Sequence, residues 1–135
     1  ALAFADAGFS TALVGPKPST GDGRTTAIMD PALRYLDALM MGPVLQAHGE
    51  PLKTMRIVDA TSRLVRSPTV TFRAAEIDLP AFGLNIANAE LNVALEEAAV
   101  ARPGVVRHEA LVERWEPGES RVAGTLSDGS NLSAK

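Results

Sequence analysis

The chain has 135 residues, a formal net charge of −3 and 46% hydrophobic residues, which is the composition of one globular domain. Clustered basic residues of the kind that bind nucleic acids are lacking. With no cysteine and only two histidines, far apart, the sequence excludes disulfides, thiolate metal sites and a cysteine nucleophile. No apolar run approaches the roughly 20 residues that span a bilayer.

The first fourteen residues predict a helix followed by a buried strand. Residues 1–7 are rich in alanine, which favours a helix, and Gly8 stands where a glycine often ends one. Residues 9–14 then have the apolar character of a short buried strand. This order is typical of the second half of a β-α-β unit, so we expect the chain to be part of a longer polypeptide whose first strand precedes Ala1.

The segment from Gly15 to Ala27 is rich in glycine and proline and predicts a loop. It contains Arg24, flanked by glycine and threonine, and a guanidinium offers a planar fork of donors that matches phosphate oxygens. The loop is therefore a candidate anion site. The alternative is an ordinary surface loop with a solvated arginine.

A helix is expected after this loop, because Asp30 can cap it and Pro31 suits its first position. Gly42-Pro43 is expected to end it, with one more helical turn up to His48.

The middle of the chain predicts an antiparallel sheet inserted between α/β elements. Residues 55–60, 64–66 and 69–73 carry the β-branched side chains that favour strands. The alternative is a long surface excursion with little pairing, which is uncommon in compact domains.

The last third of the chain returns to mixed elements. Asn88 can cap a helix that ends near Ala101, with Glu90, Glu96 and Glu97 facing water. Strands are expected at residues 105–108, 111–115 and 121–126, and residues 127–130 predict a hairpin turn before a return strand.

Read in order, these segments resemble a known family. The segments that carry the resemblance are residues 3–14, 22–28, 33–39, 51–59, 83–91 and 126–129. The chain resembles the N-terminal half of a flavin-dependent aromatic-ring hydroxylase, in the ubiquinone-biosynthesis hydroxylase branch of the p-hydroxybenzoate hydroxylase-like superfamily.

The resemblance implies an α/β fold, with an incomplete Rossmann-like FAD-binding domain and an antiparallel β insertion from the substrate-side sheet. Residues 1–50 and 88–135 would belong to the FAD-binding region and residues 51–87 to the insertion. It also implies cofactor-binding roles for four residues. These are Arg24, its neighbour Thr25, Asn88 before the second helix, and Leu111, whose main chain would lie on the adenine side.

The function implied is that of an FAD-dependent monooxygenase of ubiquinone biosynthesis. Such an enzyme uses NAD(P)H and O2 to hydroxylate the ring of a polyprenylated phenol, and the cofactor carries the hard chemistry, so no catalytic residue or metal site is assigned. Two alternatives stay open: a non-enzymatic α/β binding or scaffold module, and a flavin reductase or halogenase relative.

The implied surroundings are cytoplasmic, with a small-molecule substrate and no nucleic acid. Peripheral membrane association of the parent enzyme and self-association through exposed strand edges are further expectations.

The sequence also departs from the family pattern. The Gly-x-Gly-x-x-Gly phosphate loop would precede Ala1, and a later Gly-Asp motif would follow Lys135. Gly15 stands where an acidic residue usually binds the adenosine ribose, and Ala89 replaces the arginine of an Asn-Arg pair. We therefore expect this chain alone to bind FAD weakly or not at all.

Overall fold

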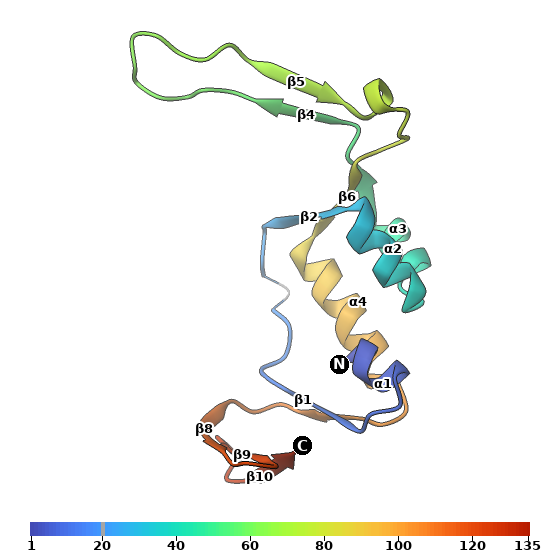
Figure 1. Cartoon of the computed structure of the whole chain (residues 1–135), viewed down its shortest axis with the longest axis vertical. Helices are drawn as coiled ribbons and strands as arrows, with labels where there is room; N and C mark the ends of the chain where they lie inside the picture. Colours follow the sequence, from blue (N-terminus) through green and yellow to red (C-terminus); the bar gives the residue numbers. More distant parts are fainter. Residues whose placement is uncertain (20) are drawn as a thin grey trace. The chain divides into compact units, whose positions relative to one another are not determined.

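The computed structural model describes residues 1–19 and 21–135, which form a mixed α/β chain (Figure 1). The chain divides into two compact units. The first comprises Ala1–Ser19 and Leu95–Lys135, and the second comprises Thr20–Ala94. Helix α4 (Asn88–Val100) contributes residues to both. Each unit has its own sheets and a small set of buried apolar side chains.

The first unit contains a parallel pair of strands. The strand expected at residues 9–14 is present as Thr11–Val14, but none of its residues is fully buried. Helix α1 (Leu2–Asp6) ends before Gly8, whose φ of +84° is strained for any other residue. The chain then enters β1 (Thr11–Val14), which pairs in parallel with β7 (Val105–His108). Parallel strands need a long crossover, and α4 is the helix that precedes β7.

A three-stranded antiparallel sheet completes this unit. Its order is β10-β9-β8, formed by β8 (Val112–Pro117), β9 (Val122–Leu126) and β10 (Asn131–Ala134). The expected hairpin turn is confirmed, because Asp128 Oδ1 accepts bonds from the Ser130 N–H and hydroxyl at 2.9 and 2.6 Å. Turn chemistry of this kind is local, so it could be predicted from four residues.

The second unit contains a different antiparallel sheet, with β6 (Gly83–Ala87) in the middle. β2 (Thr25–Met29) pairs along one side of β6, and β3 (Gly49–Pro51) pairs along the other. The expected loop therefore ends three residues early, because Thr25, Thr26 and Ala27 form ladder pairs with β6 instead of remaining in the loop.

Two helices lie beside this sheet, α2 (Asp30–Ala38) and α3 (Gly42–His48) (Figure 1). Gly42-Pro43 begins α3, so the prediction that it ends the preceding helix is wrong by a few residues. Proline has no N–H to lose at the first turn of a helix, which is why the same dipeptide fits a helix start. Asp30 lies within α2 and makes no side-chain capping bond; it pairs with Arg34 at 2.8 Å.

The core of the second unit is small and apolar. Met41, Leu45 and Ile86 are each at most 2% exposed, and Ile28 is 7% exposed. Each such side chain contributes about 1.5–3 kcal/mol relative to an exposed position.

Two of the strands expected in the middle of the chain form a two-stranded antiparallel arm (Figure 1). β4 (Thr54–Ile57) pairs with β5 (Val70–Arg73), and a short 3-10 helix, η1 (Ala74–Ile77), follows. The third strand expected at residues 64–66 is not formed. Those residues lie in the loop that joins β4 to β5, where no strand of the described chain pairs with them. No helix within the described ranges is long and apolar enough to cross a membrane.

Gly83 supplies a sharp test of the second sheet. A Cβ added there would lie 2.1 Å from Ile28 O and 2.8 Å from Met29 Cα, both backbone atoms of the neighbouring strand. We expect Gly83→Ala to lower the free energy of unfolding by more than about 2 kcal/mol, because the β2–β6 ladder must shift. Urea unfolding followed by far-ultraviolet circular dichroism measures it. The matched control is Gly23→Ala, where an added Cβ meets no atom within 4 Å; equal stability of the two variants would contradict this register.

Candidate cofactor-binding site

One carboxylate, that of Asp22, organises the loop before β2. Its Oδ1 accepts the Arg24 backbone N–H at 3.0 Å and Arg24 Nε at 2.9 Å. Its Oδ2 accepts Arg24 Nη2 at 2.8 Å and Asn88 Nδ2 at 3.1 Å. The Asp22 side chain is 17% exposed, whereas that of Arg24 is 82% exposed. The loop thus holds its carboxylate inward and presents its guanidinium outward.

These hydrogen bonds perturb both ionisable groups. The Arg24 side chain, then the Asn88 amide and the Arg24 N–H, hold the pKa of Asp22 well below its usual range. In return the Asp22 carboxylate raises the pKa of Arg24. Two of the guanidinium nitrogens are engaged, and Nη1 makes no hydrogen bond to the described residues. Arg24 therefore keeps one exposed face for a ligand, but its charge is largely balanced by Asp22.

Asn88, the first residue of α4, ties this loop to β2 and to the helix. Its Oδ1 accepts the Thr26 hydroxyl at 2.6 Å, and its Nδ2 donates to Asp22. Its backbone N–H donates to Arg24 O at 2.9 Å. The structure therefore brings three of the sequence-predicted residues, Arg24, Thr25 and Asn88, to one place at the start of α4.

Two members of this cluster were not predicted as site residues. Asp22 holds the cluster together, and Thr26 rather than its exposed neighbour Thr25 makes the bond to Asn88. The role of Asp22 could have been predicted from the local sequence, because aspartate in a turn commonly accepts a bond from the backbone N–H two residues ahead. The Thr26 contact needs the β2–β6 register and cannot be read locally.

Leu111, the fourth predicted residue, belongs to the first unit. Its N–H donates to Ser127 Oγ at 3.0 Å, and its carbonyl accepts the Ser127 N–H at 2.9 Å. The side chain is 59% exposed. The main chain of Leu111, which the resemblance places on the adenine side, is thus bonded to Ser127 through both its N–H and its carbonyl.

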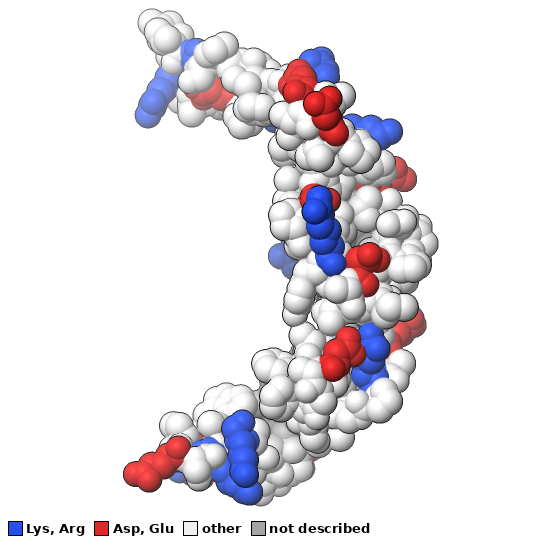
Figure 2. Space-filling view, turned by 45° about the vertical axis from the view of Figure 1, so that its right-hand side comes forward, with Lys and Arg blue, Asp and Glu red and all other residues white. Residues whose placement is uncertain are grey.

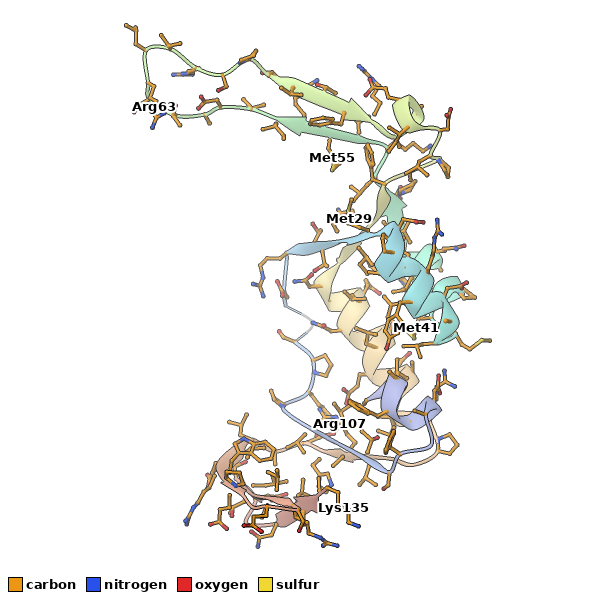
Figure 3. All side chains as sticks on the ribbon, viewed as in Figure 1. Met29, Met41, Met55, Arg63, Arg107 and Lys135 are labelled. Carbon is orange, nitrogen blue, oxygen red and sulfur yellow. The ribbon has the colours of Figure 1, made fainter. Side chains whose placement is uncertain are left out.

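The carboxyl edge of the parallel strands in the first unit is occupied by Arg107 (Figure 3). Its Nη1 donates to Gly15 O at 2.8 Å and its Nη2 to Pro16 O at 3.0 Å, and Nη1 also reaches the carbonyls of Leu13 and His108. These bonds fasten the chain after β1 to β7.

Glu96 of α4 neutralises this arginine. Its Oε1 accepts the Arg107 Nε, and the two side chains are only 23% and 11% exposed. The prediction that Glu96 faces water is therefore wrong. The carboxylate is turned inward because a largely buried guanidinium requires a charged partner.

The same edge is open next to Gly15. An added Cβ at Gly15 would meet no atom within 4 Å, and Lys17 beyond it pairs with Glu109 at 3.1 Å. In doubly wound α/β folds, ligands bind outside the carboxyl ends of parallel strands. Gly15 offers no side chain at this edge, and the carbonyls of Gly15 and Pro16 accept bonds from Arg107.

Among the described residues, no group of three His, Asp or Glu side chains could hold a metal ion. An open groove of about 390 Å³ lies in the first unit between β1 and the antiparallel sheet. It is mainly apolar and is lined by Phe4, Phe9, Val14, Trp115, Val122 and Leu132, among others. Its one charged lining residue is Lys135, and its other polar lining residues are Ser10, Thr11 and Ser133.

The comparisons with known proteins define the class of fold. No family model and no curated protein sequence match the chain. Solved structures do match. The p-nitrophenol 4-monooxygenase PnpA from Pseudomonas putida DLL-E4 has a TM-score of 0.71 at 17% identity, over 98% of this chain and 34% of its own.

Two further matches are flavin complexes. The flavin-dependent monooxygenase PieE, in complex with FAD and substrate, has a TM-score of 0.74 at 16% identity, over 98% of this chain and 25% of its own. Klebsiella pneumoniae HpxO, complexed with FAD and uric acid, has a TM-score of 0.60 at 17% identity, over 93% of this chain and 37% of its own. The chain therefore has a flavin-monooxygenase fold and spans between 25% and 37% of the length of these three proteins.

The lowered pKa of Asp22 predicts a pH-dependent contribution to stability. An ordinary aspartate titrates near pH 4 in the unfolded chain, and the folded value lies lower. The stabilisation is therefore complete above the unfolded pKa and is lost as the pH falls toward the folded one. We expect Asp22→Asn to lower the thermal midpoint at pH 7, and the difference from the unsubstituted chain to shrink by pH 3. Exposed Glu119→Gln is the control, and a pH-independent difference for Asp22→Asn would contradict the assignment.

Replacing Arg107 should lower the free energy of unfolding more than replacing a surface arginine does. Arg107→Met leaves Glu96 without its partner, so we expect a loss of about 2–4 kcal/mol in the free energy of unfolding. Arg34→Met removes an exposed pair to Asp30 and should cost less than about 1 kcal/mol. The single tryptophan, Trp115, lies in the same unit as Arg107 and reports its urea unfolding by fluorescence. A smaller loss for Arg107→Met than for Arg34→Met would refute the role.

Proposed function

We propose that this chain is the cofactor-facing segment of an FAD-dependent monooxygenase. The observation that carries the proposal is the match of nearly the whole chain to flavin-monooxygenase folds, two of them solved with FAD. The cluster around Asp22 adds support, because the residues that the resemblance assigns to the flavin lie together at the start of α4.

The residues present fit one side of such a cofactor. Arg24 offers the exposed Nη1 face of a guanidinium whose direction is fixed by Asp22, and Asn88 keeps that loop against α4. A bound flavin would supply the electron transfer from NAD(P)H and the activation of O2. The part of this chain is to orient it and to place the exposed Nη1 donor of Arg24 beside it. A pyrophosphate cradle of the Gly-x-Gly-x-x-Gly type is not in the sequence, so FAD affinity of this chain alone should be weak.

The finer assignment follows the resemblance. Residues 1–50 and 88–135 form the Rossmann-like FAD-binding region, and residues 51–87, which hold the β4–β5 arm, form the substrate-side insertion. The substrate proposed is a polyprenylated phenol of ubiquinone biosynthesis, hydroxylated in the cytoplasm or at a membrane surface with NAD(P)H as reductant.

A second candidate is a non-enzymatic α/β binding module. It is favoured by one observation, the pairing of Arg24 with Asp22, which leaves the loop with little net charge for an anion. The replacement of the ribose acceptor by Gly15 points the same way. FAD binding separates the two candidates.

The test uses the polypeptide encoded by the open reading frame that contains this chain. We expect it to be yellow or to be reconstituted by added FAD, and to oxidise NAD(P)H when a polyprenylated phenol is supplied. Oxygen consumption coupled to ring hydroxylation separates it from a reductase or halogenase. A colourless protein that FAD cannot reconstitute would contradict the proposal.

Arg24 gives the sharper variant. Arg24→Gln keeps a polar side chain but removes the charge and the guanidinium, so we expect the FAD affinity of the full polypeptide to fall about tenfold, the value of one charge-assisted hydrogen bond. Flavin fluorescence titration measures this affinity. Arg34→Gln, at an exposed position of α2, should leave the FAD affinity unchanged. An equal loss of affinity in both variants would show that Arg24 has no specific role in binding FAD.

A further inference from the structure

The β4–β5 arm is strongly basic within an acidic chain. Its residues 53–73 include five cations and one carboxylate, whereas the whole chain has 13 basic and 16 acidic residues. The cations are Lys53, Arg56, Arg63, Arg66 and Arg73, and the carboxylate is Asp59. In Figure 2, basic side chains lie along the arm. Positive charge is thus concentrated on a projecting element.

The arm also exposes apolar side chains, most of all at its end. Leu64 is fully exposed and Val65 is 83% exposed. They stand between Arg63 and Arg66, and Figure 3 places Arg63 in the loop that closes the arm. We call residues 63–66 the tip. Two neighbouring aliphatic side chains without cover, framed by two arginines, are an unusual arrangement in a water-facing loop.

The strands of the arm continue this pattern. Met55 lies opposite Phe72, and Ile57 lies opposite Val70, so these four side chains share one face of the ribbon. Each is at least 37% exposed. Arg56 and Arg73 lie on the other face, which makes the ribbon amphipathic.

Hydrogen bonds from the Asp59 side chain to the backbone fix the conformation of the loop that carries the tip. Asp59 Oδ1 accepts the Thr61 N–H, and Oδ2 accepts the Ser67 N–H, both at 3.0 Å. The one carboxylate of the arm is thus engaged with its own backbone and closes the loop across eight residues. The turn leaves the tip cations without a carboxylate partner among the described residues.

We infer that the tip and the apolar face of the arm dock on an anionic lipid surface. Arginine stems lie along apolar surface while their guanidinium groups bond phosphates, and the aliphatic pair between them enters the boundary of headgroups and acyl chains. A purely acidic protein or nucleic acid would match the charge but leave Leu64 and Val65 in water. This inference deepens the membrane-surface location proposed above by naming the residues that would make the contact. Its test needs no flavin, so its failure and the failure of the proposed FAD site are distinguishable.

The experiment is co-sedimentation of the whole chain with vesicles. Vesicles of phosphatidylcholine with 30% phosphatidylglycerol are compared with pure phosphatidylcholine, at about 0.05 and 0.5 M salt. We expect binding to the anionic vesicles that weakens with salt, and at least tenfold weaker binding to the neutral ones.

Two variants separate the charges from the apolar pair. Arg63→Gln with Arg66→Gln should weaken partitioning about 25-fold, at about fivefold for each cation. Leu64→Ser with Val65→Ser should weaken it at least tenfold, because the apolar contribution is lost. All four positions lie in an exposed loop, so folding, checked by circular dichroism, should be unchanged.

The matched controls lie elsewhere on the surface. Arg114→Gln with Arg121→Gln removes the same charge from the first unit, and Met40→Ser with Val100→Ser removes exposed apolar side chains. Both controls should keep most of the binding. Equal loss in the controls, equal binding to neutral vesicles, or no vesicle binding with self-association through the arm would each overturn the inference.

Discussion

The carboxylate of Asp22 is the group on which the candidate site depends. The loop before β2 is rich in glycine and has no core of its own, so its shape has to come from polar contacts. Four hydrogen bonds converge on this one side chain and fix both Arg24 and Asn88. Because Asn88 also bonds Thr26 and Arg24 O, the same network joins the loop, the second strand and the start of α4.

Arg107 plays the comparable part in the first unit, with the charges reversed. There a largely buried guanidinium gathers strand-end carbonyls and the carboxylate of Glu96. The two clusters share one consequence for ligands: a cation that orders its own loop has fewer donors left for an anion. Arg24 remains exposed and its Nη1 is available to a ligand, whereas all three guanidinium nitrogens of Arg107 bond to the protein. This difference is why the candidate site rests on Arg24.

Features that depend on contacts between neighbouring residues could be predicted from the sequence, whereas features that depend on contacts between distant residues could not. The helix end at Gly8 and the turn at Asp128 depend on neighbouring residues, and these predictions are confirmed. Helix α4 begins at Asn88, close to the expected start, but the Asn88 side chain bonds Thr26 and Asp22 instead of serving as the expected cap. Arg107 bonds Gly15 and Pro16, more than ninety residues away, through a parallel pairing that no local pattern reveals. Residues 64–66 have strand-like side chains, but they have no strand beside them in the described chain, so they remain a loop.

The most direct measurement is nuclear magnetic resonance of the isotopically labelled chain during titration with FAD. It detects weak binding and locates it residue by residue. The account predicts saturable shifts of the backbone amides of Gly23, Arg24, Thr25 and Asn88, together with the Asn88 side-chain amide. Saturable shifts confined to other parts of the chain would contradict the claim that this loop faces a flavin.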